Sequence, residues 1–185
     1  MEIYLIRHTT PAVAIGMIYG RTDVALADTF VEEREKILKK LPSELDVVYS
    51  SPSTRCTQLA DHISKNYRTD ERLYEVNFGR WEGKTWDTVD QQESAPWMQD
   101  FVHVCPPEGE SMLAMQKRVM HFWEGLLRLS PAKAAVVTHG GVIRIILAAV
   151  RNMALQSSFE IKVGLSDVIL VRPHLSGRKE EITVL

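Results

Sequence analysis

Short apolar runs alternate along the chain with segments of helical periodicity. The runs at 2–7, 46–50 and 134–138 are apolar enough to be strands, and 167–171 and 181–184 resemble two later strands. Continuous apolar runs are typical of strands that are covered on both faces, as they are in a parallel sheet.

Helices are predicted at about 28–41 and 111–129, where apolar residues recur every three or four positions. A Ser-Pro-Ser start signal predicts another helix near 53–66, and a fourth, at about 141–150, follows the third strand. Strands that alternate with helices predict an α/β fold, a three-layer α/β/α arrangement with a mainly parallel central sheet.

The segment 72–107 departs from this alternation because it is rich in Trp, Gly, Glu and Pro. It predicts a long excursion that contains a short helix, the kind of connection that often covers a site. With 185 residues and no internal repeat, we expect residues 1–185 to form a single domain with this excursion over the site.

Composition excludes several classes of function. The formal net charge is −2, so no broad basic surface is available for nucleic acid, and any anion site must be local. We find no leader sequence and no membrane span, and therefore expect a cytoplasmic protein without a membrane partner. The two cysteines, Cys56 and Cys105, are too few for a disulfide framework or a thiolate metal cluster, and neither is followed by Arg at the spacing of a cysteine phosphatase.

Candidate chemistry lies where the predicted strands end. The first strand ends at Arg7 and His8, the loop after the second leads to Arg55, and His139 follows the third, directly before the pair that begins at Gly140. Because parallel strands place their carboxyl ends at one edge of a sheet, we expect two imidazoles and two guanidinium groups to meet there. Planar guanidinium groups bind phosphate through paired hydrogen bonds, and a helix that begins at glycine can present its first backbone N–H groups to the same anion. The sequence therefore predicts a phosphate-handling enzyme.

Four motifs, in this order, resemble the histidine phosphatase superfamily, whose members share a phosphoglycerate mutase-like fold. The resemblance extends from residue 3 to about 147. The motifs are Arg7-His8-Thr9, Arg55 within Ser-Pro-Ser-Thr-Arg-Cys-Thr, Glu75 within Leu-Tyr-Glu-Val-Asn-Phe-Gly-Arg-Trp-Glu-Gly, and His139 within Thr-His-Gly-Gly-Val-Ile-Arg.

The resemblance implies that His8 is a nucleophile that becomes a phosphohistidine. Glu75 would be the general acid and then the base. Arg7, Arg55 and His139 would hold the oxygens of the phosphoryl group, so that neither a metal nor a cofactor is expected.

Within the superfamily, the run from 18 to 26 and the Asn-Phe-Gly-Arg-Trp-Glu-Gly segment are similar to α-ribazole phosphatases. This implies a small phosphate ester as substrate, such as a benzimidazole ribonucleotide. Thr9 stands where the family commonly has glycine, and its hydroxyl could donate to phosphate. With Gly20, Arg21 and Gly140, it completes the expected substrate contacts.

Other interpretations stay open at this point. A broad phosphatase for sugar phosphates or a phosphoglycerate mutase fits the same motifs, and so does a catalytically silent module that binds phosphorylated ligands. Arg21 could be a surface residue, Glu82 is a rival of Glu75 with an expected structural role, and Arg144 is expected behind the site. The four tryptophans are expected mainly to pack, and the sequence does not indicate an oligomeric state.

Overall fold

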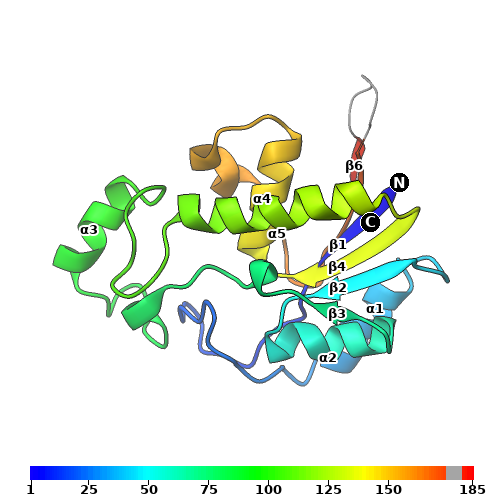
Figure 1. The fold of residues 1–185 in the computed structure, drawn as a ribbon. Helices are drawn as coiled ribbons and strands as arrows, with labels where there is room; N and C mark the ends of the chain where they lie inside the picture. The colour runs from blue at the N-terminus through cyan, green and yellow to red at the C-terminus, as the bar shows by residue number, and fades with distance from the viewer. Residues whose placement is uncertain (174–180) are drawn as a thin grey trace.

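A six-stranded sheet forms the centre of the protein, in the order β3-β2-β4-β1-β5-β6 (Figure 1). The computed structural model describes residues 1–173 and 181–185. The four strands from β3 to β1 run parallel, β5 runs antiparallel to β1, and β6 antiparallel to β5. The predicted mainly parallel sheet is therefore confirmed. The strands are β1 (Glu2–Arg7), β2 (Val47–Ser50), β3 (Arg68–Thr69), β4 (Lys133–Thr138), β5 (Val168–Arg172) and β6 (Glu181–Val184).

Two layers of helices enclose the sheet, as the sequence predicts (Figure 1). Side chains that alternate along β1 explain the layers: Ile3 and Leu5 pack on one side, Tyr4 and Ile6 on the other. The first pair belongs to the core beneath α4 (Met112–Leu129) and α5 (Gly140–Val150), and the second to the core beneath α1 (Phe30–Leu38) and α2 (Thr54–Ile63). None of the helices among the described residues has both the length and the apolarity needed to cross a membrane.

The segment 72–107 lies beyond the end of the sheet and includes α3 (Gln91–Gln99), at the left of Figure 1. It has a small core of its own, in which Trp81 and Trp97 are buried together with Ile18 and Val89. The indole nitrogen of Trp81 donates to Glu93 at 3.2 Å. Trp123 is buried in the main core, so three of the four tryptophans pack as expected.

Two helix starts show where local signals suffice and where they do not. Ser111 caps α4 as its position suggests, because its Oγ accepts from the amide of Ala114 at 3.1 Å. The start of α2 is different: Ser53 makes no side-chain cap, and the helix begins at Thr54. Asp23, from a distant loop, accepts hydrogen bonds from the amide and the hydroxyl of Thr54 at 2.8 Å each. The start of α2 is therefore capped by a residue distant in sequence.

Candidate active site

The predicted meeting of side chains at the sheet edge is confirmed. In the pairing of β1 with β4, Arg7 lies opposite Thr138, so His8 and His139 leave neighbouring strands at the same level. Their ring centroids are 5.2 Å apart, with the planes inclined at 65°. Arg55 reaches the same place from the first turn of α2, and its Nη2 lies 3.3 Å from Nδ1 of His139.

His8 is held as a neutral imidazole with one nitrogen free to react. Its Nδ1 lies 2.7 Å from the carbonyl oxygen of Thr9. Because a carbonyl only accepts, Nδ1 carries the proton, and Nε2 keeps its lone pair. Burial, and then repulsion by Arg55 and Arg7, lowers the pKa of His8 to about 3 against the opposing hydrogen bond with Thr9.

His139 is fully buried, and the protein engages both of its ring nitrogens. Its Nδ1 accepts from Arg55, while Nε2 lies 2.8 Å from the hydroxyl of Ser51 and donates to it. Burial, reinforced by Arg55 and His8, holds the pKa of His139 well below its usual value. His139 therefore fixes Arg55 against the end of β2, and its expected contact with phosphate stays a prediction.

Arg55 is fully buried, although it lies in the first turn of a helix. Its Nη2 donates to the carbonyl of Gly20 at 2.6 Å, and Nη1 donates to that of Thr22 at 3.0 Å. Its Cζ lies 5.1 Å from the centroid of the Tyr19 ring. The loop at 19–22 thus fixes this guanidinium group from one side, and His139 fixes it from the other.

Glu82 shapes the loop that holds Arg55. Its Oε1 accepts from the amides of Arg21 and Phe78 at 3.0 Å each, and its Oε2 accepts from the amide of Thr22 at 2.8 Å and from the hydroxyl of that residue. A Cβ at Gly20 would collide with Oε1, and Gly20 has a φ of +36°, so only glycine suits this position. Glu82 has the structural role that the sequence indicates, and it also positions the site.

Glu75 is anchored at the N-terminus of α5. Its Oε2 accepts from the amide of Gly141 at 3.1 Å, and its Oε1 accepts from the amide of Val76 at 3.0 Å. A Cβ at Gly141 would collide with Oε1 of Glu75. A Cβ at Gly140 would lie 3.3 Å from Cζ of Arg7 and 3.1 Å from Nη1 of Arg144. The lack of a Cβ at Gly141 therefore leaves room for the carboxylate of Glu75. The lack of a Cβ at Gly140 leaves room for the guanidinium groups of Arg7 and Arg144.

Three donors in this cluster have no acceptor in the described part of the chain. Arg7 Nε, Thr9 Oγ1 and Arg55 Nε are buried without a hydrogen-bond partner, and Ser158 Oγ is the fourth such side-chain atom there. Leaving a buried polar group unpaired costs about 1–3 kcal/mol, so such groups are uncommon outside functional sites. The cluster is built to donate hydrogen bonds to an acceptor such as an anion.

A cavity of about 310 Å³ opens beside this cluster. This volume is at the lower end of the range for small-molecule sites. The cavity is lined by both polar and aromatic or apolar residues, whereas His8 is itself only 1% exposed. The polar part of the lining includes Arg7, Glu75, Gly141 and Arg144, and its aromatic or apolar part includes Met17, Tyr19, Phe78, Trp86, Met112 and Phe159.

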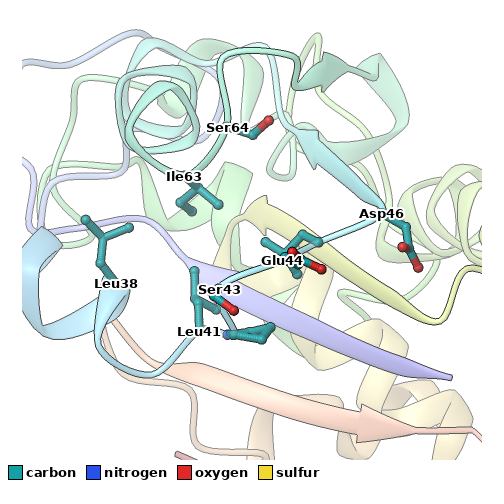
Figure 2. A pocket seen from close by; sticks show the side chains of 9 residues that line it. Leu38, Leu41, Ser43, Glu44, Asp46, Ile63 and Ser64 are labelled. Carbon is teal, nitrogen blue, oxygen red and sulfur yellow. The ribbon is translucent and has the colours of Figure 1, made fainter.

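A larger cavity, of about 460 Å³, lies at the amino end of β2 (Figure 2). Leu38, Leu41 and Ile63 surround it, and its charged side chains are those of Glu44 and Asp46. Their negative charge disfavours a phosphate ester, and none of the residues that line this cavity is basic. Of these two cavities, the chemistry of the lining favours the smaller one as the candidate site.

Comparison with known proteins gives the family. Residues 3–182 match the model of the histidine phosphatase superfamily (branch 1). The chain belongs to the histidine phosphatase superfamily. The resemblance carried by the four motifs is confirmed, and the protein is a phosphatase.

Relatives within the superfamily carry different names. "Putative phosphoserine phosphatase 2" of Hydrogenobacter thermophilus is 29% identical over 193 residues, which cover 100% of this chain and 94% of the relative. "Probable phosphoglycerate mutase GpmB" of Yersinia pestis is 26% identical, over 83% of this chain and 76% of the relative. The crystal structure of the α-ribazole phosphatase from Shigella flexneri superposes with a TM-score of 0.89 at 22% identity, covering 100% and 96% of the two chains. At that identity, the likeness shows the fold.

Two arginines of this histidine phosphatase lie elsewhere than the sequence suggests. Arg21 does not line the cavity: its Nη2 pairs with Glu110 at 3.0 Å, and its Nε donates to the carbonyl of Glu75 at 3.3 Å. It therefore braces the loop at 19–22. The sequence predicts Arg144 behind the site, but this residue lines the cavity, because the helical turn from Gly140 brings it close to Arg7.

Proposed function

We propose that this phosphatase hydrolyses phosphomonoesters without a metal ion, through a phosphohistidine at His8. The observation that carries the proposal is the neutral His8 with a free Nε2, next to the three buried donors on Arg7, Thr9 and Arg55. A neutral imidazole is the nucleophilic form, and donors without acceptors are what a phosphoryl group requires.

In the first step, Nε2 of His8 attacks phosphorus, and a P–N bond forms as the P–O bond to the alcohol breaks. The electron pair of that bond goes to the leaving oxygen, which takes a proton from the carboxyl group of Glu75. Arg7 and Arg55 donate to the phosphoryl oxygens as charge redistributes over them. Thr9 adds a neutral donor.

In the second step, water attacks phosphorus, and the P–N electron pair returns to Nε2 of His8. The carboxylate of Glu75 takes the proton of the water. The sum of the two steps is an ester and water converted to an alcohol and phosphate, with His8 and Glu75 in their starting forms.

The aromatic residues in the lining of the cavity support α-ribazole 5′-phosphate as a candidate substrate. Trp86 and Phe159 are 42% and 49% exposed, so both rings are available to a flat base. Stacking of a base on an aromatic ring contributes about 1–3 kcal/mol in single-stranded nucleic-acid sites. Phe78 and Trp86 come from the segment 72–107, which supports a role for this excursion as the cover of the site.

A second candidate class is a small ester of a phosphorylated hydroxy acid or sugar. The relatives named phosphoserine phosphatase and phosphoglycerate mutase support this class, and a mutase would return the phosphoryl group to another hydroxyl of the same molecule. The set formed by His8, Arg55 and Glu75 is intact, which argues against a module that binds phosphorylated ligands without turning them over.

Hydrolysis of p-nitrophenyl phosphate in the presence of EDTA tests the proposal. We expect turnover by the wild-type protein and a loss of at least about 10³-fold in His8→Ala. His62→Ala is the matched control, because His62 is exposed on α2, and we expect a near-normal rate. Near-normal turnover by His8→Ala would overturn the mechanism. A kcat/KM panel that includes α-ribazole 5′-phosphate and 3-phosphoglycerate then ranks the two substrate classes.

A further inference from the structure

The guanidinium group of Arg144 is held in a fixed position in the cavity, and the mechanism proposed above gives it no role. Its Nε donates to the carbonyl of Ile161 at 3.0 Å, which fixes the plane of the group. Its Cζ lies 6.0 Å from the centroid of the Phe159 ring. The remaining nitrogens belong to a side chain that lines the cavity and is only partly buried, so they are open to a ligand.

Arg7 and Arg144 lie side by side, with Glu75 nearby but without an ion pair to either of them in the described part of the chain. Both guanidinium groups lie close to Gly140, where a Cβ would be 3.3 Å from Cζ of Arg7 and 3.1 Å from Nη1 of Arg144. Burial, and then the charge of Arg7, lowers the pKa of Arg144, with Glu75 acting in the opposite direction. Elsewhere in the described chain, Arg21, Arg118 and Arg172 all pair with acidic side chains, whereas Arg7 and Arg144 form no ion pair there.

We propose that Arg144 binds a second anionic group of the substrate, a carboxylate on its alcohol part. Arg7 adjoins His8 and serves the phosphoryl group, and the proposal rests on the phosphatase function proposed above. Arg144 lies next to Phe159 in the lining of the cavity. A planar guanidinium fork matches a carboxylate with two parallel hydrogen bonds, and a second negative charge would relieve the repulsion between the two arginines. This contact favours phosphorylated hydroxy acids over uncharged alcohols.

Matched substrates that differ in one carboxylate test this proposal. O-phosphoserine and O-phosphoethanolamine form one such pair, and 3-phosphoglycerate and glycerol 3-phosphate form another. We expect the wild-type protein to have the higher kcat/KM for the acid in each pair. In Arg144→Met, kcat/KM for the acids should fall about 10- to 100-fold, mainly through KM, because hydrogen bonds to charged groups have this strength. The esters without a carboxylate should change less than about threefold.

The controls separate this inference from the phosphatase function. Arg151→Met removes an exposed arginine at the end of the same helix and should leave both members of each pair unchanged. Turnover of p-nitrophenyl phosphate reports the phosphatase function alone. The inference is overturned if Arg144→Met lowers both members of a pair equally, since Arg144 would then act on the phosphoryl group or the fold. It is also overturned if the wild-type protein does not prefer the acids, a result that needs no variant.

Discussion

Acid should destabilise this protein through His8. The pKa of His8 is lowered to about 3 in the folded protein, against an ordinary value of 6.5. Below pH 6.5, the imidazole of His8 binds a proton in the unfolded chain but stays neutral in the folded protein until the pH approaches 3. The stability that the neutral form contributes is therefore complete above about pH 6.5 and is lost as the pH falls toward 3.

The magnitude follows from the two pKa values. At pH 5 the loss attributable to His8 is about 2 kcal/mol, since 1.5 pH units below 6.5 correspond to roughly 1.4 kcal/mol each. His139 shifts in the same direction, so the total loss of the wild-type protein exceeds that of His8 alone.

Urea unfolding at pH 7 and pH 5, in buffers without phosphate, measures this loss. In His8→Gln, which does not titrate, the free energy of unfolding should fall by about 2 kcal/mol less between the two pH values than in the wild-type protein. His62→Gln should behave like the wild-type protein, because His62 is exposed. If His8→Gln and the wild-type protein lost the same free energy, the neutral, buried state of His8 would be refuted.

Other variants test single contacts. Glu75→Gln should slow alkyl phosphates at least about tenfold more than p-nitrophenyl phosphate, whose leaving group needs little protonation; equal losses in kcat/KM would contradict a general acid. Glu82→Ala should raise the inhibition constant for inorganic phosphate about tenfold, because the loop that holds Arg55 loses three hydrogen bonds; an unchanged constant would show that Arg55 does not depend on the loop. Ser111→Ala should lower the free energy of unfolding by about 1 kcal/mol with kcat unchanged; no change in urea unfolding would contradict the cap.

Most elements of the sheet and its flanking helices are predictable because each has a local signal, whereas the two exposed residues of β3 have none and that strand is not predicted. The apolar run before Arg7 and the one before His139 place both residues at strand ends, and parallel pairing then brings the two ends together. The same signals predict four helices, but α1 is shorter than the predicted 28–41. The buried apolar face of α4 does not extend to Leu129, because this last residue of the helix is 64% exposed.

The detailed contacts of the site are not predictable from local signals, because they depend on segments distant in sequence. Arg144 lines the cavity beside Phe159, which lies in the 3₁₀ segment Leu155–Glu160, and the sequence pattern does not predict that segment. Arg21 gives no sign of its pairing with Glu110, which is 89 residues away. His139 likewise shows no sequence signal for its hydrogen bond to Ser51.

The most direct test of the account is to trap the covalent intermediate. A ³²P-labelled aryl phosphate is mixed with Glu75→Gln, in which the second step lacks its base, and the reaction is quenched in alkali within milliseconds. We predict label on the protein that resists alkali, is lost in acid as a P–N bond requires, maps to the peptide containing His8, and is absent from His8→Ala. Turnover without labelled protein, or label on a different residue, would contradict a phosphohistidine at His8.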